Sequence, residues 1–373
     1  MDHGCCPAGR RRLARPHLVT ELIEYRAATD DELETCIQLQ QLVFRPGQED
    51  APIRYRSYVR EDPTYQPGQT RVAVKDGQIV GHLRVWDRKL SVRGLVLTTG
   101  GIGSLLTHPE FRGQGIASGI LRDTERYFEE VDYDMGLLFS IIGTAYYASR
   151  GWTAISIPTF VIDLGSTKAD TRPEIRKLTL DLDLEGIRHL HASLSANYTG
   201  IEVRNEAYWS TGPAKCRSVF PAIGVERQGR LAGYVNWDGD ADDLWISECC
   251  ANDEDVYTDL ASVLLRAANE AGATSLQGSL PTDHPLVASL VKKSGYAAKW
   301  GAHDEMMVKI SRWDLLREKL RTVIPDLPSD FPVSQAGIDA FWLALLGSSV
   351  GDSEWCDRLG PCPPIFYWWK DIF

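Results

Sequence analysis

The chain has 373 residues, of which 43% are hydrophobic and 24% charged, an ordinary composition for a soluble globular protein of two or three domains. There are 40 Lys and Arg residues against 51 Asp and Glu residues, so the formal net charge is −11. This charge argues against nucleic acid as the main partner and suits a cationic small molecule. No run approaches the roughly 18–20 apolar residues that span a bilayer, so we expect no membrane partner.

The first twenty residues are basic but lack the apolar segment that a secretory signal needs. We therefore expect residues 1–20 to form a disordered extension. The eight cysteines are scattered, and their adjacent pairs at 5–6 and 249–250 do not have the CxxC spacing of a metal site. These features predict a cytoplasmic protein without a structural metal.

Apolar periodicity and turn residues predict a layered α/β unit in the first part of the chain. In chain order, the predicted elements are a helix over 30–44, a Pro- and Gly-rich stretch over 46–69, two antiparallel strands over 71–75 and 79–86 joined by a hairpin turn at Asp76-Gly77, a strand over 95–106, a helix over 115–130 and a buried apolar run over 135–142.

The same order of elements then repeats. Lys75–Trp86 (KDGQIVGHLRVW) is similar to Arg227–Trp237 (RQGRLAGYVNW), and Tyr147–Trp152 (YASRGW) is similar to Val291–Tyr296 (VKKSGY). Two matches in the same order and at similar spacing indicate a tandem duplication. We expect the boundary between the two copies near 165–173, in a polar stretch that ends in proline.

A shorter segment follows from about residue 311. It contains a predicted helix over 313–321, a loop over 325–332 and a second apolar helix over 336–346. The chain then ends in PCPPIFYWWKDIF, which is aromatic up to the last residue. Because such a tail would aggregate in water, we expect it to be buried against another part of the protein.

The strongest local signal is the loop Arg112-Gly113-Gln114-Gly115-Ile116-Ala117, between a predicted strand and a predicted helix. Glycines at this junction allow a tight turn that directs backbone N–H groups at an anion, and the helix N-terminus and Arg112 add positive charge. A pyrophosphate is the natural occupant. The loop is neither a Walker loop nor a GxGxxG fingerprint.

The stretch Leu105–Ala117 (LLTHPEFRGQGIA) resembles the core motif of the GNAT superfamily of N-acetyltransferases, which ends in Arg/Gln-x-x-Gly-x-Gly/Ala after a strand and a proline. Residues 146–152 (YYASRGW) resemble the family's second signature, Tyr-x-x-x-Gly-Phe/Tyr. The resemblance implies that the cofactor-binding residues hold acetyl-CoA or a longer acyl-CoA. Leu105 and Thr107 are expected to contact pantetheine, and Arg112, Gly113, Gln114, Gly115, Ile116 and Ala117 are expected to hold the pyrophosphate. Leu106 and Ser118 complete the expected cofactor-binding set.

The second copy lacks this loop. At the corresponding place it reads Ala251-Asn252-Asp253-Glu254-Asp255-Val256, whose three acids would repel a phosphate and suit a capped helix start. We therefore expect a tandem GNAT fold of the α/β (α+β) class, with mixed central sheets flanked by helices. The predicted divisions are a catalytic domain over 21–168, a degenerate domain over 169–310 and a C-terminal segment over 311–373.

Two GNAT-like units of which only the first has the loop resemble the enhanced-intracellular-survival family of aminoglycoside N-acetyltransferases. That resemblance implies acylation of a primary amine on a small molecule, with Tyr147 as general acid and the terminal carboxylate of Phe373 as general base. It also leads us to expect a homo-oligomer. The third domain of that family is longer than the 63 residues left here. The long-chain N-acyltransferases of glycopeptide antibiotics are an alternative, and a non-catalytic CoA-binding relic is a second one.

Overall fold

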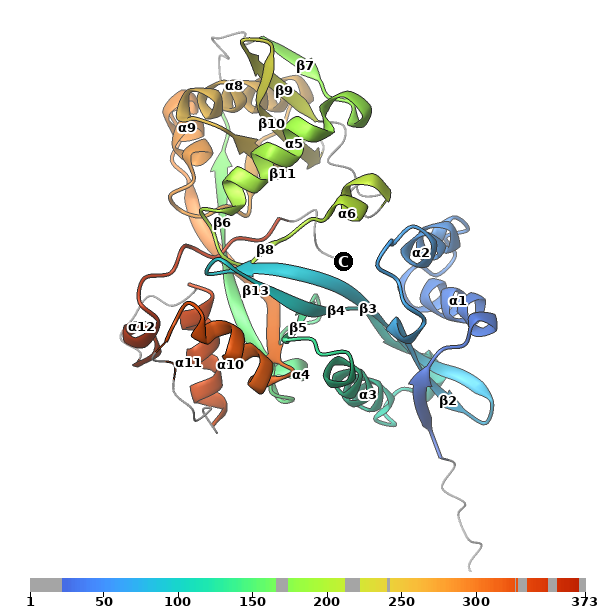
Figure 1. Ribbon diagram of the computed structural model, residues 1–373. Helices are drawn as coiled ribbons and strands as arrows, with labels where there is room; N and C mark the ends of the chain where they lie inside the picture. Colours follow the sequence, from blue (N-terminus) through green and yellow to red (C-terminus); the bar gives the residue numbers. More distant parts are fainter. Residues whose placement is uncertain are drawn as a thin grey trace, which may run out of the picture.

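The computed structural model describes residues 22–165, 174–211, 222–239, 242–325, 327, 334–347 and 354–368. Their strands join in one mixed sheet that runs through the molecule, with helices packed on its faces (Figure 1). This arrangement confirms the expected α/β class. The expected extension over residues 1–20 lies outside the described residues, as does Phe373.

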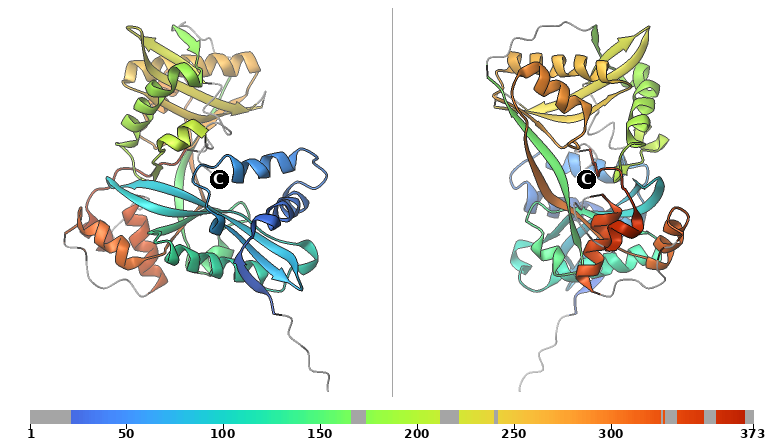
Figure 2. Two further views of the ribbon diagram at one scale, coloured as in Figure 1. Left: turned by 45° about the vertical axis from the view of Figure 1, so that its right-hand side comes forward. Right: turned by 90° about the vertical axis from the view of Figure 1, so that its left-hand side faces the viewer.

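The first repeat contains a strongly twisted set of strands with α3 on one side and α1 and α2 toward its outer end (Figure 2). Its elements are β1 (Glu24–Ala27), α1 (Leu33–Phe44), α2 (Ala51–Arg60), β2 (Thr70–Lys75), β3 (Gln78–Val92), β4 (Leu95–Thr107), α3 (Ile116–Glu130), β5 (Met135–Phe139), α4 (Ala145–Ala148) and β6 (Thr153–Asp163).

The second repeat and the C-terminal segment complete the described chain. Their elements are β7 (Ile175–Lys177), α5 (Leu180–Ser195), β8 (Ile201–Glu202), α6 (Glu206–Thr211), β9 (Ile223–Arg227), β10 (Arg230–Gly239), β11 (Asp243–Ala251), α8 (Glu254–Ala271), β12 (Ser275–Gly278), α9 (Pro285–Ser294), β13 (Lys299–Ile310), α10 (Trp313–Arg321), α11 (Gln335–Leu345) and α12 (Glu354–Leu359).

The two repeats share one pattern of strand pairing. In the first, β2, β3 and β4 are antiparallel and β5 is parallel to β4; in the second, β9, β10, β11 and β12 are related in the same way. The two hairpin turns also agree, since Asp76 and Gly77 have φ of 52° and 77° while Gln228 and Gly229 have φ of 53° and 73°. These left-handed pairs are what a tight two-residue hairpin requires. The predicted duplication is therefore confirmed.

The last strand of each repeat lies in the half of the sheet built by the other repeat. The strand order is β1-β2-β3-β4-β5-β13-β6-β12-β11-β10-β9-β7, so β13 pairs with β5, and β6 pairs with β12. The two exchanged strands are long and antiparallel to each other, and they connect the two halves in Figure 1. One continuous hydrogen-bonded sheet therefore joins the repeats.

Both faces of the first repeat's sheet are covered. One face packs on α3 through Ile116, Ile120, Leu121 and Phe128, all buried as the predicted helix requires, whereas Val131 after the helix is 42% exposed. The other face packs on the C-terminal segment, where Leu316, Leu320, Phe341, Trp342 and Leu345 are buried against β3, β4, β5, β6 and β13.

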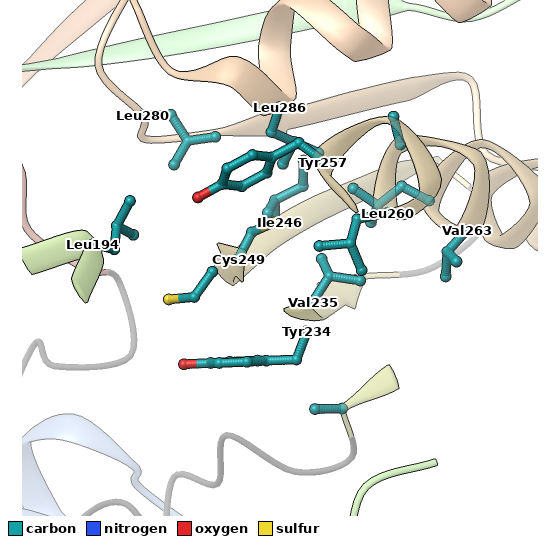
Figure 3. Close-up of a cluster of buried hydrophobic side chains, with 14 of the residues drawn as sticks. Leu194, Tyr234, Val235, Ile246, Cys249, Tyr257, Leu260, Val263, Leu280 and Leu286 are labelled. Atoms are coloured by element: carbon teal, nitrogen blue, oxygen red, sulfur yellow. The ribbon is translucent and has the colours of Figure 1, made fainter. Parts of the chain in front are cut away.

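The second repeat has its own core between α8 and the strands β10 and β11 (Figure 3). The close-up shows apolar side chains on both faces of these strands: Val235 lies toward α8, whereas the ring of Tyr234, the preceding residue of β10, lies on the opposite face. They include Tyr257, Leu260 and Val263 from α8, Tyr234 and Val235 from β10, Ile246 and Cys249 from β11, and Leu194, Leu280 and Leu286 from the surrounding elements.

Arg93 fastens the C-terminal segment to the first repeat. This residue occupies the left-handed region (φ 52°) in the turn between β3 and β4. Its guanidinium donates hydrogen bonds to the carbonyl oxygens of Ala344 and Leu345 at the end of α11, and to those of Leu359, Gly360 and Pro361 at the end of α12 and just after it. A cation at the carbonyl ends of two helices is favoured by their dipoles.

A buried ion pair joins the two repeats, and a hydrogen bond connects it to the C-terminal tail. The Arg88 Nε atom on β3 lies 3.2 Å from a carboxylate oxygen of Glu202, which also accepts a 3.2 Å hydrogen bond from the hydroxyl of Tyr367. Arg204 forms a bidentate pair with Glu248 on β11 at 2.6 and 3.0 Å, within the second repeat. Since a buried ion pair gains little net energy but costs much when broken, the Arg88–Glu202 pair fixes the position of one repeat against the other.

Two local predictions differ from the structure. The Pro- and Gly-rich stretch contains α2, with Pro52 in its first turn, a position where proline fits a helix because no backbone N–H is needed there. The apolar run 135–142 is a strand only as far as Phe139, and Ile141 and Ile142 are 85% and 76% exposed. Among the described residues, no helix is long and apolar enough to cross a membrane.

We expect Arg93→Met to lower the free energy of unfolding by about 2 kcal/mol, because it leaves carbonyl groups at two helix ends without their donor. Methionine keeps an unbranched aliphatic side chain and must adopt the same left-handed φ as arginine, so the variant removes only the guanidinium. Lys299→Met is the control, since Lys299 forms an exposed ion pair with Asp163 that contributes little. The measurement is the urea midpoint by circular dichroism, and equal midpoints for both variants would contradict the assignment.

Candidate acyl-CoA site

The site begins where β4 and β5 separate. Their parallel pairing runs from Thr99 opposite Met135 to Ile102 opposite Leu138 and then stops, although β4 continues to Thr107. β5 stays in place because β13 pairs with its other edge. Among the strands that the structure describes, one edge of β4 therefore has no partner over its last residues.

A β-bulge at Ser104 determines which backbone groups face this gap. Arg84 pairs with Gly103 and His82 with Leu106, so β4 has one residue more than β3 in this interval, and Ser104 has a left-handed φ of 52°. The N–H of His108 donates to the carbonyl of Val80 on β3 at 2.8 Å.

Successive residues of a strand direct their backbone N–H and C=O groups to opposite edges of that strand. The hydrogen bond from the His108 N–H to β3 therefore fixes the edge that each preceding residue of β4 faces. The groups of Leu106 also face β3, and those of Leu105 and Thr107 face the gap. These are the two residues expected to contact pantetheine.

The glycine loop forms the next wall. Gly113 and Gly115 have φ of 76° and 78°, which glycine adopts without strain, and Gly115 is the N-cap of α3. The first backbone N–H groups of α3 therefore remain available to an anion. Arg112 is exposed on the rim, and Lys75 lies 5.7 Å from the ring centroid of Phe111. The loop thus combines free N–H groups with two cations.

A cavity of about 480 Å³ connects the gap to the loop. It contains nearly all the predicted cofactor-binding residues, with Gln114 outside its lining and in contact with Lys75 Nζ at 3.5 Å. Sequence reasoning did not assign four lining residues to the cofactor site: Phe111 and Tyr146 lie within the two quoted motifs but at variable positions, and Val43 and Ile142 lie in segments without a motif. The lining consists of Val43, Leu105, Leu106, Thr107, Phe111, Arg112, Gly113, Gly115, Ile116, Ala117, Ser118, Ile142, Tyr146 and Tyr147.

Tyr147 lies in α4 at the inner end of the cavity and is 7% exposed. Burial raises the pKa of its phenol to about 12, with a further increase from Tyr146 and a small opposing effect of Arg150. Burial disfavours the charged phenolate, so Tyr147 keeps its proton throughout the neutral range. Its position and protonation suit a proton donor.

Tyr146 is fixed beside it by polar contacts. The guanidinium of Arg150 stacks on the Tyr146 ring at 3.8 Å and donates to the Ser118 hydroxyl at 2.7 Å. The Ser118 and Tyr146 hydroxyls are 3.2 Å apart. The predicted residue Ser118 therefore links the start of α3 to α4 and borders the cavity.

The described part of the C-terminal tail approaches the same gap from the other side. Phe366, Tyr367 and Trp368 are buried, and the Tyr367 ring lies 5.0 Å from that of Phe139, the last residue of β5. Residues 369–373, including the candidate base Phe373, are outside the described part of the chain.

The corresponding place in the second repeat is closed to an anion. The Asp253 side chain accepts a 2.8 Å hydrogen bond from the N–H of Val256 and caps α8. A carboxylate thus occupies the helix start that is left open in α3, as the sequence predicted.

Comparison with known proteins agrees with this geometry. Residues 24–155 match the family model described as an acetyltransferase (GNAT) domain. A probable N-acyltransferase from Enterococcus faecalis has a similar structure, with a TM-score of 0.64, 15% identity, and coverage of 82% of this chain and 75% of that one.

Two further structures share the fold. Eis1 from Mycobacterium abscessus has a TM-score of 0.54 and 15% identity, covering 78% of this chain and 74% of that one. The N-myristoyltransferase of Saccharomyces cerevisiae with bound myristoyl-CoA has a TM-score of 0.51 and 12% identity, covering 78% and 82%. At these identities the likeness establishes the fold alone.

We expect Gly115→Asp to weaken CoA binding by ~30-fold, since it would place a carboxylate where Asp253 lies in the second repeat. The control is Gly229→Asp, because Gly229 also has a positive φ and an added Cβ there would have no atom within 4 Å. Isothermal titration with CoA gives both dissociation constants. An unchanged constant in Gly115→Asp would contradict a pyrophosphate site at this loop.

Proposed function

We propose that this chain, whose residues 24–155 form an acetyltransferase domain of the GNAT family, binds acyl-CoA in the described cavity and acylates a small-molecule amine there. The observation that carries the proposal is one cavity bordered by the open α3 N-terminus, the free edge of β4 and the protonated Tyr147. Anion binding, carbonyl polarisation and proton donation are the three functions that transfer from a thioester requires.

In the proposed reaction the amine nitrogen attacks the thioester carbonyl directly, without a covalent enzyme intermediate. The gap-facing backbone N–H group of Leu105 stabilises the negative charge that develops on the carbonyl oxygen. The N–H group of Thr107 lies about 7 Å farther along the strand and is left for the pantetheine arm. The carbon–sulfur bond then breaks, and the Tyr147 hydroxyl protonates the departing thiolate. The amine loses one proton to a base, so the products are an amide and free CoA.

The base in this proposal is the terminal carboxylate of Phe373. Support comes from the path of the tail, which is buried as far as Trp368 and contacts Phe139 at the edge of the gap.

We propose a cationic, amine-bearing antibiotic such as an aminoglycoside as the acceptor, because the chain carries a net charge of −11. The second candidate is the amino sugar of a glycopeptide acylated with a longer chain. It is favoured by the apolar rim of the cavity, where Val43, Phe111 and the exposed Ile142 lie. Detectable turnover would dismiss the third candidate, a non-catalytic CoA-binding relic.

The divisions at 21–168, 169–310 and 311–373, a cytoplasmic location and a homo-oligomeric state also remain proposals. In this scheme the second unit builds the acceptor side without binding CoA, which its capped α8 supports. The exchanged strands β6 and β13 belong to both units in space.

The test is release of free thiol from acetyl-CoA and from a long-chain acyl-CoA, each with an aminoglycoside and with a glycopeptide amino sugar. We expect acetyl-CoA with the aminoglycoside to give turnover.

Tyr147→Phe should lower kcat by at least ~10-fold and leave the dissociation constant of CoA unchanged. Since the pKa of Tyr147 is about 12, the wild-type kcat should not fall through deprotonation of this phenol below about pH 10. Silence across all four combinations would refute the proposed activity.

Adding three glycines after Phe373 should reduce kcat by ~100-fold, because it moves the terminal carboxylate away from its position, and CoA affinity should stay the same. The matched variant adds three glycines before Met1. Full turnover in the C-terminally extended protein would exclude the terminal carboxylate as the base.

A further inference from the structure

One buried imidazole contacts the bulge on which the site depends. His82 lies on β3 opposite Leu106 and is 2% exposed. Its Nδ1 atom is 3.1 Å from the carbonyl oxygen of Ser104. A carbonyl oxygen only accepts hydrogen bonds, so Nδ1 carries the proton and donates it. Burial lowers the pKa of His82 to about 4, which keeps the ring neutral.

The contact falls on the one strained residue of β4. A left-handed φ of 52° is unfavourable for serine and persists only where the surroundings hold it. A hydrogen bond from an immobile, buried ring to the carbonyl of that residue fixes the orientation of the peptide that follows. The N–H of this peptide belongs to Leu105.

The bulge also determines which residues of β4 direct their backbone groups to β3 and which direct them to the gap. With the extra residue, Leu105 and Thr107 direct their backbone groups into the gap and Leu106 directs its groups to β3. A regular strand would pair His82 with Leu105 instead, so the gap would receive the groups of Leu106. The state of the bulge therefore decides which N–H groups meet a bound thioester.

We propose that His82 is a positioning residue for acyl transfer, which holds the Ser104 bulge so that the N–H of Leu105 faces the thioester carbonyl. This inference rests on the proposed function. His82 acts through Ser104, because its ring is absent from the lining of the 480 Å³ cavity. It lines instead a separate cavity of about 10 Å³ beside α1 and α2.

The first experiment compares His82→Leu with His82→Asn. Leucine fills the space without a donor, whereas the asparagine amide nitrogen lies the same number of bonds from the backbone as Nδ1. We expect kcat in His82→Leu to fall by ~100-fold with the CoA dissociation constant within ~3-fold of wild type, and His82→Asn to recover kcat to within ~5-fold. Equal losses in both variants, or no loss in His82→Leu, would overturn the proposal.

The second experiment is independent of turnover. Hydrogen exchange of the Leu106 and His108 amides, which bond to β3 only in the bulged register, should accelerate by ~10-fold in His82→Leu and stay unchanged in His82→Asn. His284→Leu is the control, since it removes a buried imidazole from the second repeat. Unchanged exchange in His82→Leu would overturn the proposal. If wild-type protein released no thiol while the exchange result held, the proposed function would fail and the bulge assignment would stand.

Discussion

The free edge of β4 is the constraint on which the rest of the site depends. A strand inside a sheet normally pairs on both sides, and an unpaired edge attracts other strands. Here β5 turns away after Leu138 and is held by β13 on its far side, so the gap opens without loosening the sheet. The exchange of strands between the repeats therefore supports the local separation that admits a ligand.

Charge and burial are distributed around this gap in a consistent way. Cations and free N–H groups surround the exposed loop, where a pyrophosphate can be neutralised in water. The inner end is apolar and buried, which keeps Tyr147 protonated. In the second repeat, Asp253 occupies the corresponding helix start, so the duplicated unit has kept the fold and lost the anion site. The difference between an open anion site in the first repeat and a closed one in the second depends on a few residues at the start of α3 and α8.

The local features of the fold and site could be predicted because they depend on short segments. The glycine loop, the Tyr147 signature, the hairpin at Asp76-Gly77 and the cap at Asp253 all take their conformation from neighbouring residues. The strand exchange could not be predicted, because the apolar runs of β5, β6 and β13 carry no information about their partners. The bulge at Ser104 was also missed, since serine gives no sign of a left-handed conformation. α2 was missed because Pro52 indicates a loop as readily as a helix start.

The position of β13 has a consequence for the order in which the protein can form during synthesis. The ribosome completes β5 about 170 residues before it completes β13, the strand that pairs with the far edge of β5, because β5 ends at Phe139 and β13 at Ile310. Until then the nascent first repeat exposes one edge of β5, and β6 has no partner before β12 is made, so neighbouring chains could capture these strands. Completion of the acyl-CoA site is therefore a late, non-local event, and folding should be slower than for two separate domains of the same size.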